Sequence, residues 1–181
     1  MFALFVNYRR DGYPNGSAWP PLQYFFWKAC YGMGAMEAAR EICDRYLDLF
    51  ERNHKETLCV WEQFRAESGQ GAGNMRFSGF VTPVVAMWKA RRISGSVQTG
   101  YDVIVRAVKI SSGNAELQLE SPFYSGNTGI SIVLSPDCGY TVRQNDKIIG
   151  NVKSDRFGWL GIAFKIDSGV GTRLNIKADA Q

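Results

Sequence analysis

The chain has 181 residues, of which 45% are hydrophobic and 21% are charged, a balance that excludes an intrinsically disordered protein. Its formal net charge is only +4, and lysines and arginines are spread along the chain, so we expect no nucleic-acid partner. No apolar run approaches the roughly 18–20 residues that span a bilayer. The N-terminus also lacks the pattern of a signal peptide. We therefore expect no membrane partner and favour a cytoplasmic location.

From Pro20 onward, three helices are predicted in the first half of the chain. Apolar residues recur with helical spacing from residue 20 to the glycines at 32 and 34, and again over residues 37–51. A third pattern runs from about Gly79 to Arg92. The first of these helices is apolar on nearly every side, and a helix without a polar face is expected to be buried on all sides. Either the β half packs against it, or its packing partners are absent from this chain.

Residues 53–78, between the second and third helices, are predicted to form a long connecting segment. It is rich in glycine at its far end and holds the aromatic residues Trp61, Phe64 and Phe77. Connections of this length inside a compact domain are usually functional or disordered, and the aromatic residues argue against disorder. The glycine cluster "GQGAG" lacks the lysine and the preceding strand of a phosphate-binding loop, so we expect no nucleotide cofactor.

The second half changes to the period of β-strands. Six short alternating segments are separated by clusters of Gly, Asn, Ser and Asp, and they begin near residues 101, 115, 129, 139, 161 and 173. This pattern predicts a small antiparallel β-sandwich over residues 96–181, after a helical domain over residues 1–95. The boundary falls in the Gly- and Ser-rich segment 93–100.

No metal site is predicted. The only histidine is His54, and no two cysteines have the C-x-x-C spacing of a zinc site. The four cysteines are Cys30, Cys43, Cys59 and Cys138.

Glu62 is the most promising catalytic candidate among the ionisable residues. It lies between Trp61 and Phe64 in the connecting segment, just before the glycine cluster. A carboxyl group between aromatic side chains has a higher cost of ionisation, which suits general acid or base catalysis. The alternative is an ordinary loop glutamate whose side chain reaches water.

Several residues near the first helix could bind a sugar ring or its hydroxyl groups. Trp19 and Trp61 offer aromatic faces, and Gln23 is a polar residue in an apolar helix. Asp11 and Asn15 precede the same corner, although both residue types also form turns without any further role. For the aromatic residues, including those of the β half, the alternative is a place in the core.

Two stretches resemble elements of trehalases and related inverting α-glycosidases. "YPNGSAWPPLQYF" is similar to the proline–tryptophan element that precedes a helix in that group. "WEQF", the glycine cluster and "RFSGF" are similar to the glutamate element, glycine turn and aromatic element that follow it. The order and spacing of these elements also resemble the group, which includes mannosylglycerate-hydrolase-like enzymes.

The resemblance implies an α+β chain in two parts: the C-terminal helices of an (α/α)6 barrel, followed by a small antiparallel β-sandwich. It also implies hydrolysis of α-glycosidic, in particular α-glucosidic, bonds with inversion. Glu62 would be the general base, and Trp19 with Gln23 would line the sugar site. The general acid would belong to a missing N-terminal portion of the enzyme, so this chain alone would be inactive because the acid is absent. The alternatives are a non-catalytic carbohydrate-binding or interaction module and a scaffold without a ligand.

Overall fold

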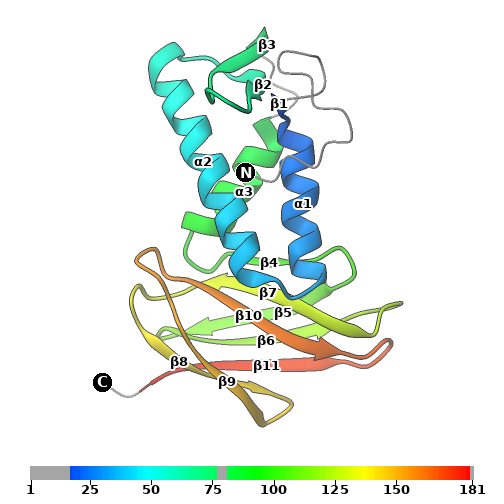
Figure 1. The fold of residues 1–181 in the computed structure, drawn as a ribbon. Coiled ribbons are helices and arrows are strands. Elements are labelled where there is room, and N and C mark those ends of the chain that lie inside the picture. The colour runs from blue at the N-terminus through cyan, green and yellow to red at the C-terminus, as the bar shows by residue number, and fades with distance from the viewer. Residues whose placement is uncertain (1–16, 77–80, 180–181) are drawn as a thin grey trace. The chain divides into compact units, whose positions relative to one another are not determined.

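The computed structural model describes residues 17–76 and 81–179 (Figure 1). In chain order these residues form β1 (Ser17–Ala18), α1 (Pro20–Gly32), α2 (Met36–Thr57), β2 (Trp61–Arg65), β3 (Gly71–Met75), α3 (Val81–Arg92), β4 (Val97–Thr99), β5 (Ile104–Ser111), β6 (Asn114–Glu120), β7 (Gly126–Val133), β8 (Gly139–Gln144), β9 (Lys147–Lys153), β10 (Trp159–Ile166) and β11 (Thr172–Ala178). None of these helices combines the length and apolar character needed to cross a bilayer.

The prediction of a partial (α/α)6 barrel is wrong. The structure is 43% strand and 30% helix, and its described residues contain three helices and three antiparallel sheets. The connecting segment does not link two barrel helices as a loop, because β2 and β3 within it form an antiparallel hairpin. Ser17 and Ala18, shortly before α1, also enter a sheet. Helical periodicity located the helices, but it did not determine what packs on them.

The chain divides into two compact units, and the division passes through α1, α2 and α3. The first unit comprises residues 1–27 and 41–88, and the second comprises residues 28–40 and 89–181. We describe each unit separately.

A three-stranded sheet with the order β1-β2-β3 characterises the first unit. Phe64 of β2 is almost fully buried, and its ring meets the ring of Tyr46 from α2 edge to face, with centroids 6.0 Å apart. On the same helix, the thiol of Cys43 lies 3.5 Å from the carbonyl oxygen of Met87 in α3. Apolar side chains of α2 therefore pack both on the sheet and on α3, as its periodicity requires.

Two antiparallel sheets form the body of the second unit (Figure 1). One has the strand order β10-β7-β4, and the other has the order β5-β6-β11-β8-β9. Alternate residues of their strands point inward and share one apolar core, because successive side chains of a strand face opposite sides. Leu117, Ile130, Leu160 and Ile176 are among its fully buried members. The outward-facing residues of β6 and β11 are mostly polar.

The end of α1 and the start of α2 belong to this second unit and lie against the β10-β7-β4 sheet (Figure 1). Tyr31 is fully buried, and its hydroxyl lies 2.7 Å from that of Ser131 on β7. Between the helices, Gly34 has a φ of +70°, and a Cβ there would lie 3.0 Å from the carbonyl oxygen of Thr128. Glycine therefore allows both the left-handed turn and the close approach to the sheet.

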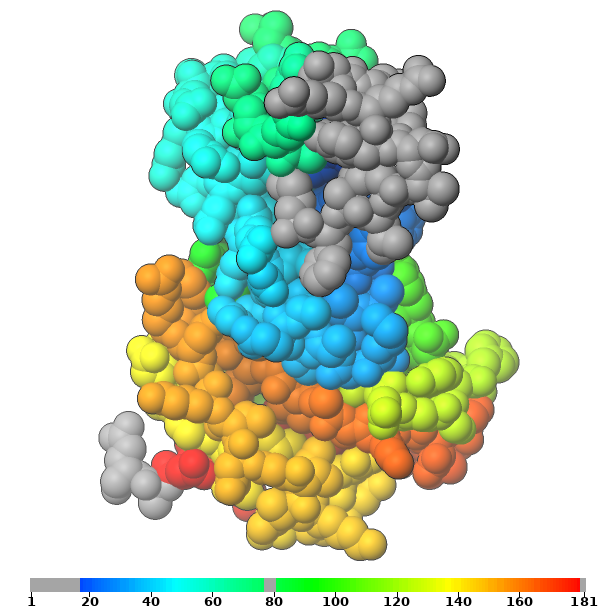
Figure 2. Space-filling view, in the orientation of Figure 1, coloured from blue at the N-terminus to red at the C-terminus, as the bar shows by residue number. Residues whose placement is uncertain are grey.

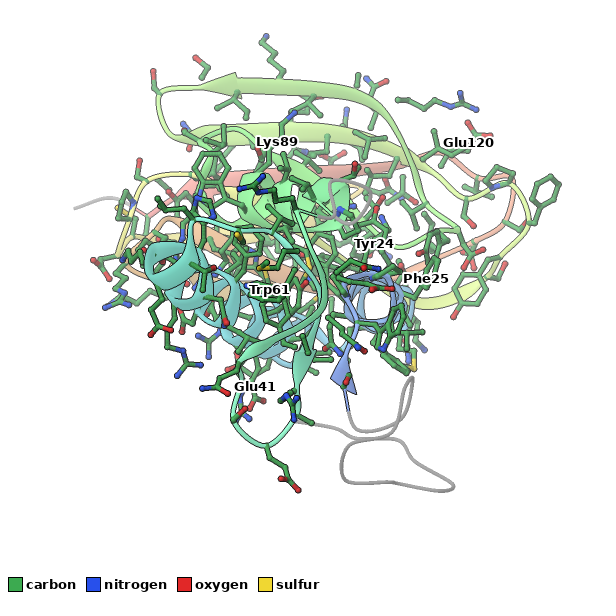
Figure 3. The ribbon with its side chains drawn as sticks, turned by 90° about the horizontal axis from the view of Figure 1, so that it is seen from above. Tyr24, Phe25, Glu41, Trp61, Lys89 and Glu120 are labelled. Atoms are coloured by element: carbon green, nitrogen blue, oxygen red, sulfur yellow. The ribbon has the colours of Figure 1, made fainter. Side chains whose placement is uncertain are left out.

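Within this chain, α1 is buried over only part of its surface. Trp27 and Tyr31 are buried, but Phe25 is 55% exposed, and Leu22 and Phe26 are exposed as well. Figure 3 shows Tyr24 and Phe25 side by side on this helix. An apolar sequence by itself does not ensure burial, because burial needs a neighbouring surface on each side.

Candidate functional site

A β-bulge of β3 in the first unit places two residues, Gly73 and Asn74, opposite Glu62 of β2. In the β2–β3 ladder Trp61 pairs with Met75 and Gln63 pairs with Ala72, so the register shifts across Glu62. A bulge of this kind turns a side chain away from the regular alternation of the strand, and bulges are common beside active sites. Glu62 is 8% exposed, so its carboxylate lies largely out of water.

Asn74 of β3 binds the Glu62 carboxylate with two groups. Its backbone N–H donates to Oε2 over 3.1 Å, and its side-chain amide donates to the same oxygen over 2.9 Å. A Cβ on Gly73 would lie 2.7 Å from this oxygen, so glycine is needed for the carboxylate to approach the β3 backbone. The two bonds fix the orientation of the carboxylate plane, which a general base requires.

Gln63 adds a second buried polar side chain beside Glu62. It is 6% exposed, and its Nε2 lies 3.4 Å from where a Cβ of Gly73 would be. Within the described part of the chain, its Oε1 is buried and accepts no hydrogen bond. A buried amide oxygen without a donor is costly, so it is suited to accept a hydrogen bond from a ligand or water.

The last turns of α2 hold the hairpin that carries this cluster. Asn53 is buried, donates from Nδ2 to the carbonyl oxygen of Gly69 over 2.7 Å, and accepts from the N–H of Gly71 over 2.7 Å. The ring of Trp61 lies directly against the Cα of Gly71, and its Nε1 donates to the hydroxyl of Thr57 over 3.2 Å. Trp61 therefore packs on the glycine-rich turn of its own hairpin.

The pairing of β1 with β2 brings Trp19 toward Glu62. Ala18 pairs with Phe64, which places Trp19 one residue beyond that pair and next to the strand that holds Glu62. Trp19 is partly buried, and its carbonyl oxygen accepts from the N–H of Gln23 in the first turn of α1. The structure thus brings the elements of Trp19, Gln23 and Glu62 together in one unit. Asp11 and Asn15 lie outside the described residues.

The aromatic residues of the β half have mixed positions. Tyr140 and Trp159 are buried, as the core alternative expected, whereas Phe123 is 96% exposed. Phe157 packs beneath the guanidinium groups of Arg91, Arg92 and Arg156. The ring of Phe157 therefore packs against arginine side chains within the second unit.

Two members of the cluster, Gln63 and Asn74, were not identified from the sequence. Their neighbours in the chain, Glu62 and Gly73, were noted, but only the hairpin register shows that the four residues meet. No group of three or more metal-ligand residues occurs among residues 17–76 and 81–179. Comparisons of the chain with known protein families and with curated proteins find no match.

Proposed function

We propose that the chain supplies the general base and part of the sugar site of an inverting α-glycosidase. The observation that carries the proposal is the orientation of the buried Glu62 carboxylate by Asn74. The resemblance of the surrounding motifs to inverting α-glycosidases supports the same role. The proposal concerns this carboxylate and its neighbours and does not depend on a helical barrel.

In this proposal, Glu62 removes a proton from a water molecule as the water attacks the anomeric carbon. An inverting enzyme places the general acid about 6.5–9.5 Å from the base, on the other face of the sugar ring. Trp19 would contact the apolar face of the ring, and the Oε1 atom of Gln63 would accept a hydrogen bond from a sugar hydroxyl or the attacking water.

The portion of the enzyme that supplies the acid is proposed to contact α1. Leu22, Phe25 and Phe26 are exposed, and their spacing of three and four residues places them on one face of the helix. A group of exposed apolar side chains of this kind is typical of an interaction surface. In this proposal the apolar character of α1 serves contact with that portion of the enzyme.

An α-glucosyl fluoride tests the base without requiring the acid. Water attacks the anomeric carbon opposite the fluorine, the carbon–fluorine bond breaks, fluoride leaves with the electron pair, and Glu62 accepts the proton of the water. Because fluoride departs without protonation, this chain should release it even without the acid. A fluoride electrode measures the rate, and NMR identifies the anomer of glucose that forms first.

The expected result is β-glucose as first product and a release rate that Glu62→Gln lowers to the uncatalysed level. Glu67→Gln is the matched control, because Glu67 is an exposed glutamate in the turn of the same hairpin. Release that is unchanged in Glu62→Gln, or the absence of any Glu62-dependent release, would overturn the proposal.

A further inference from the structure

A depression of about 380 Å³ lies on the second unit, where one end of its five-stranded sheet meets the β8–β9 turn. Its lining comes from β5, β6 and β11 and from that turn. The hairpin of β8 and β9 lies at the surface of this unit, in yellow to orange in Figure 2. Figure 3 labels Glu120, which lines the depression near the end of β6. The volume is within the range of small-molecule sites.

Two ion pairs flank the depression. The Nε atom of Arg106 donates to Glu120 over 2.7 Å, and an Nη atom of Arg173 donates to Asp146 over 2.6 Å. Gln118 lies between them, because it pairs with Arg173 across β6 and β11. The lining therefore holds two guanidinium groups and two carboxylates, which sum to a net charge of zero.

Backbone features position the residues that carry these side chains. The β5–β6 register shifts between Val105 and Ala107, so Arg106 occupies a bulge that turns it toward Glu120. Asn145 joins the β8–β9 turn to the backbone of Arg173 by two hydrogen bonds. Its Oδ1 accepts from the N–H of Arg173 over 2.9 Å, and its own N–H donates to the carbonyl oxygen of Arg173. The backbone at the site is thus held in place before any ligand binds.

The chemistry of the lining selects the ligand class. Each guanidinium is already neutralised by a carboxylate, which disfavours an anion, and each carboxylate is likewise paired, which disfavours a cation. The exposed surface of the lining is divided about equally between polar and apolar atoms, so a ligand with both kinds of surface matches it better than a wholly apolar ligand. A sugar hydroxyl both donates and accepts, and a pair of neighbouring hydroxyls matches an Arg–carboxylate pair that offers one donor and one acceptor.

We propose that this depression is a binding site for a neutral oligosaccharide, separate from Glu62. Arg106 with Glu120 binds hydroxyl groups of one sugar residue, Arg173 with Asp146 binds those of a second, and Gln118 bridges them. Such a site would hold the second unit on a polysaccharide surface. The depression is open and its ion pairs are exposed, so its affinity for a short oligosaccharide is weak.

NMR titration of the isotope-labelled chain with maltotriose, cellotriose and inorganic phosphate tests this proposal. The two trisaccharides distinguish α- from β-linked glucose, and phosphate tests whether the site instead binds an anion. The expected result is a saturable shift of the Arg106 and Arg173 side-chain signals with at least one trisaccharide. Arg106→Gln and Arg173→Gln should each weaken binding roughly five- to tenfold, the effect of losing a hydrogen bond to a charged group at an exposed site.

Matched controls lie on the same two strands. Lys109→Gln on β5 and Lys177→Gln on β11 remove the same charge from residues that line a different depression, so they should leave binding unchanged. Glu62→Gln should also leave it unchanged, so the result is independent of the proposed hydrolase. Shifts with phosphate alone, no shift with either trisaccharide, or equal losses in the lysine controls would overturn the proposal.

Discussion

Asn74 donates two hydrogen bonds to one oxygen of Glu62, one from its backbone and one from its side chain. The two residues lie on opposite strands of the β2–β3 hairpin, and the bulge of β3 places Asn74 opposite Glu62. The side-chain bond can be removed by mutation, whereas the backbone bond persists in every variant that folds. A substitution of Asn74 can therefore test how the carboxylate of Glu62 is oriented without preventing the hairpin from forming.

The first prediction concerns the side-chain bond. Asn74→Ala should lower the free energy of unfolding by about 1 kcal/mol, because one hydrogen bond to a charged group is lost while the backbone bond remains. Urea denaturation measures the change. Asn151→Ala, at an exposed asparagine of β9, is the control and should have a smaller effect. Equal effects of the two substitutions would mean that the Glu62 contact contributes nothing to stability.

Gly71 gives a second prediction, since a Cβ there would lie only 2.3 Å from ring carbons of Trp61. Gly71→Ala should displace the ring and destabilise the chain by about 1–3 kcal/mol, the usual cost of overpacking. The indole N–H signal of Trp61 should move at the same time, because the ring would leave the hydroxyl of Thr57. Gly150→Ala is the control, since nothing lies within 4 Å of its Cβ position.

A double variant separates the clash from a backbone effect. If the ring causes the loss, Gly71→Ala should cost less in a Trp61→Ala background, where the space is empty. An unchanged cost in that background would contradict the packing explanation and would point to the backbone conformation of the turn.

The hairpin also shows how far the sequence could predict this fold. Side-chain period located α1, α2, α3 and the alternating segments of the β half, because each presents a regular apolar face. In β3, glycine occupies positions 71 and 73, so no side-chain alternation marks the strand. In β1 only two residues pair, which is too few for any period.

The candidate site was accessible from the sequence only in part. Glu62 stood out because aromatic residues flank it, but its partner Asn74 lies 12 positions away and is defined by the shifted register. The sequence also indicated that α1 needs neighbours on every side, but not which of its side chains this chain leaves exposed. An apolar helix indicates that a surface will be covered, but its sequence does not specify which surface covers it.

A buried ion pair in the second unit gives the third prediction. The side chain of Arg91 is 2% exposed, and its Nη1 lies 2.6 Å from Oδ2 of Asp155. The geometry of this contact is not that of a hydrogen bond. Asp155→Asn should cost about 2–3 kcal/mol, somewhat less than a fully buried pair, because Asp155 is 25% exposed. The variant keeps an Oδ1 acceptor for the N–H groups of Phe157 and Trp159.

Thermal and urea unfolding measure this loss. Asp167→Asn removes the same charge from an exposed position and is the control. If both variants lose the same small amount, the charge of Asp155 does not stabilise the fold and Arg91 is held by its contacts with the rings of Phe157 and Trp159.

The final prediction concerns the pH dependence that Lys28 gives to stability. Burial lowers the pKa of Lys28 from 10.5 to about 8. Between these values the unfolded chain binds a proton that the folded chain has lost, so the Lys28 contribution to the free energy of unfolding rises with pH and is lost as pH falls through 8. Burial raises the pKa of Tyr46, which acts in the opposite direction above pH 10.

Comparison with Lys28→Met cancels this second effect, and the carbonyl oxygen of Thr99 keeps the Gln98 amide as a donor in the variant. Urea denaturation from neutral to alkaline pH should show that the free energy of unfolding of Lys28→Met exceeds that of the parent by less and less as pH rises from 8 to 10.5. For Lys165→Met, at an exposed lysine, the difference from the parent should not change with pH. A parallel Lys28→Met curve would mean that Lys28 keeps its ordinary pKa in the folded chain.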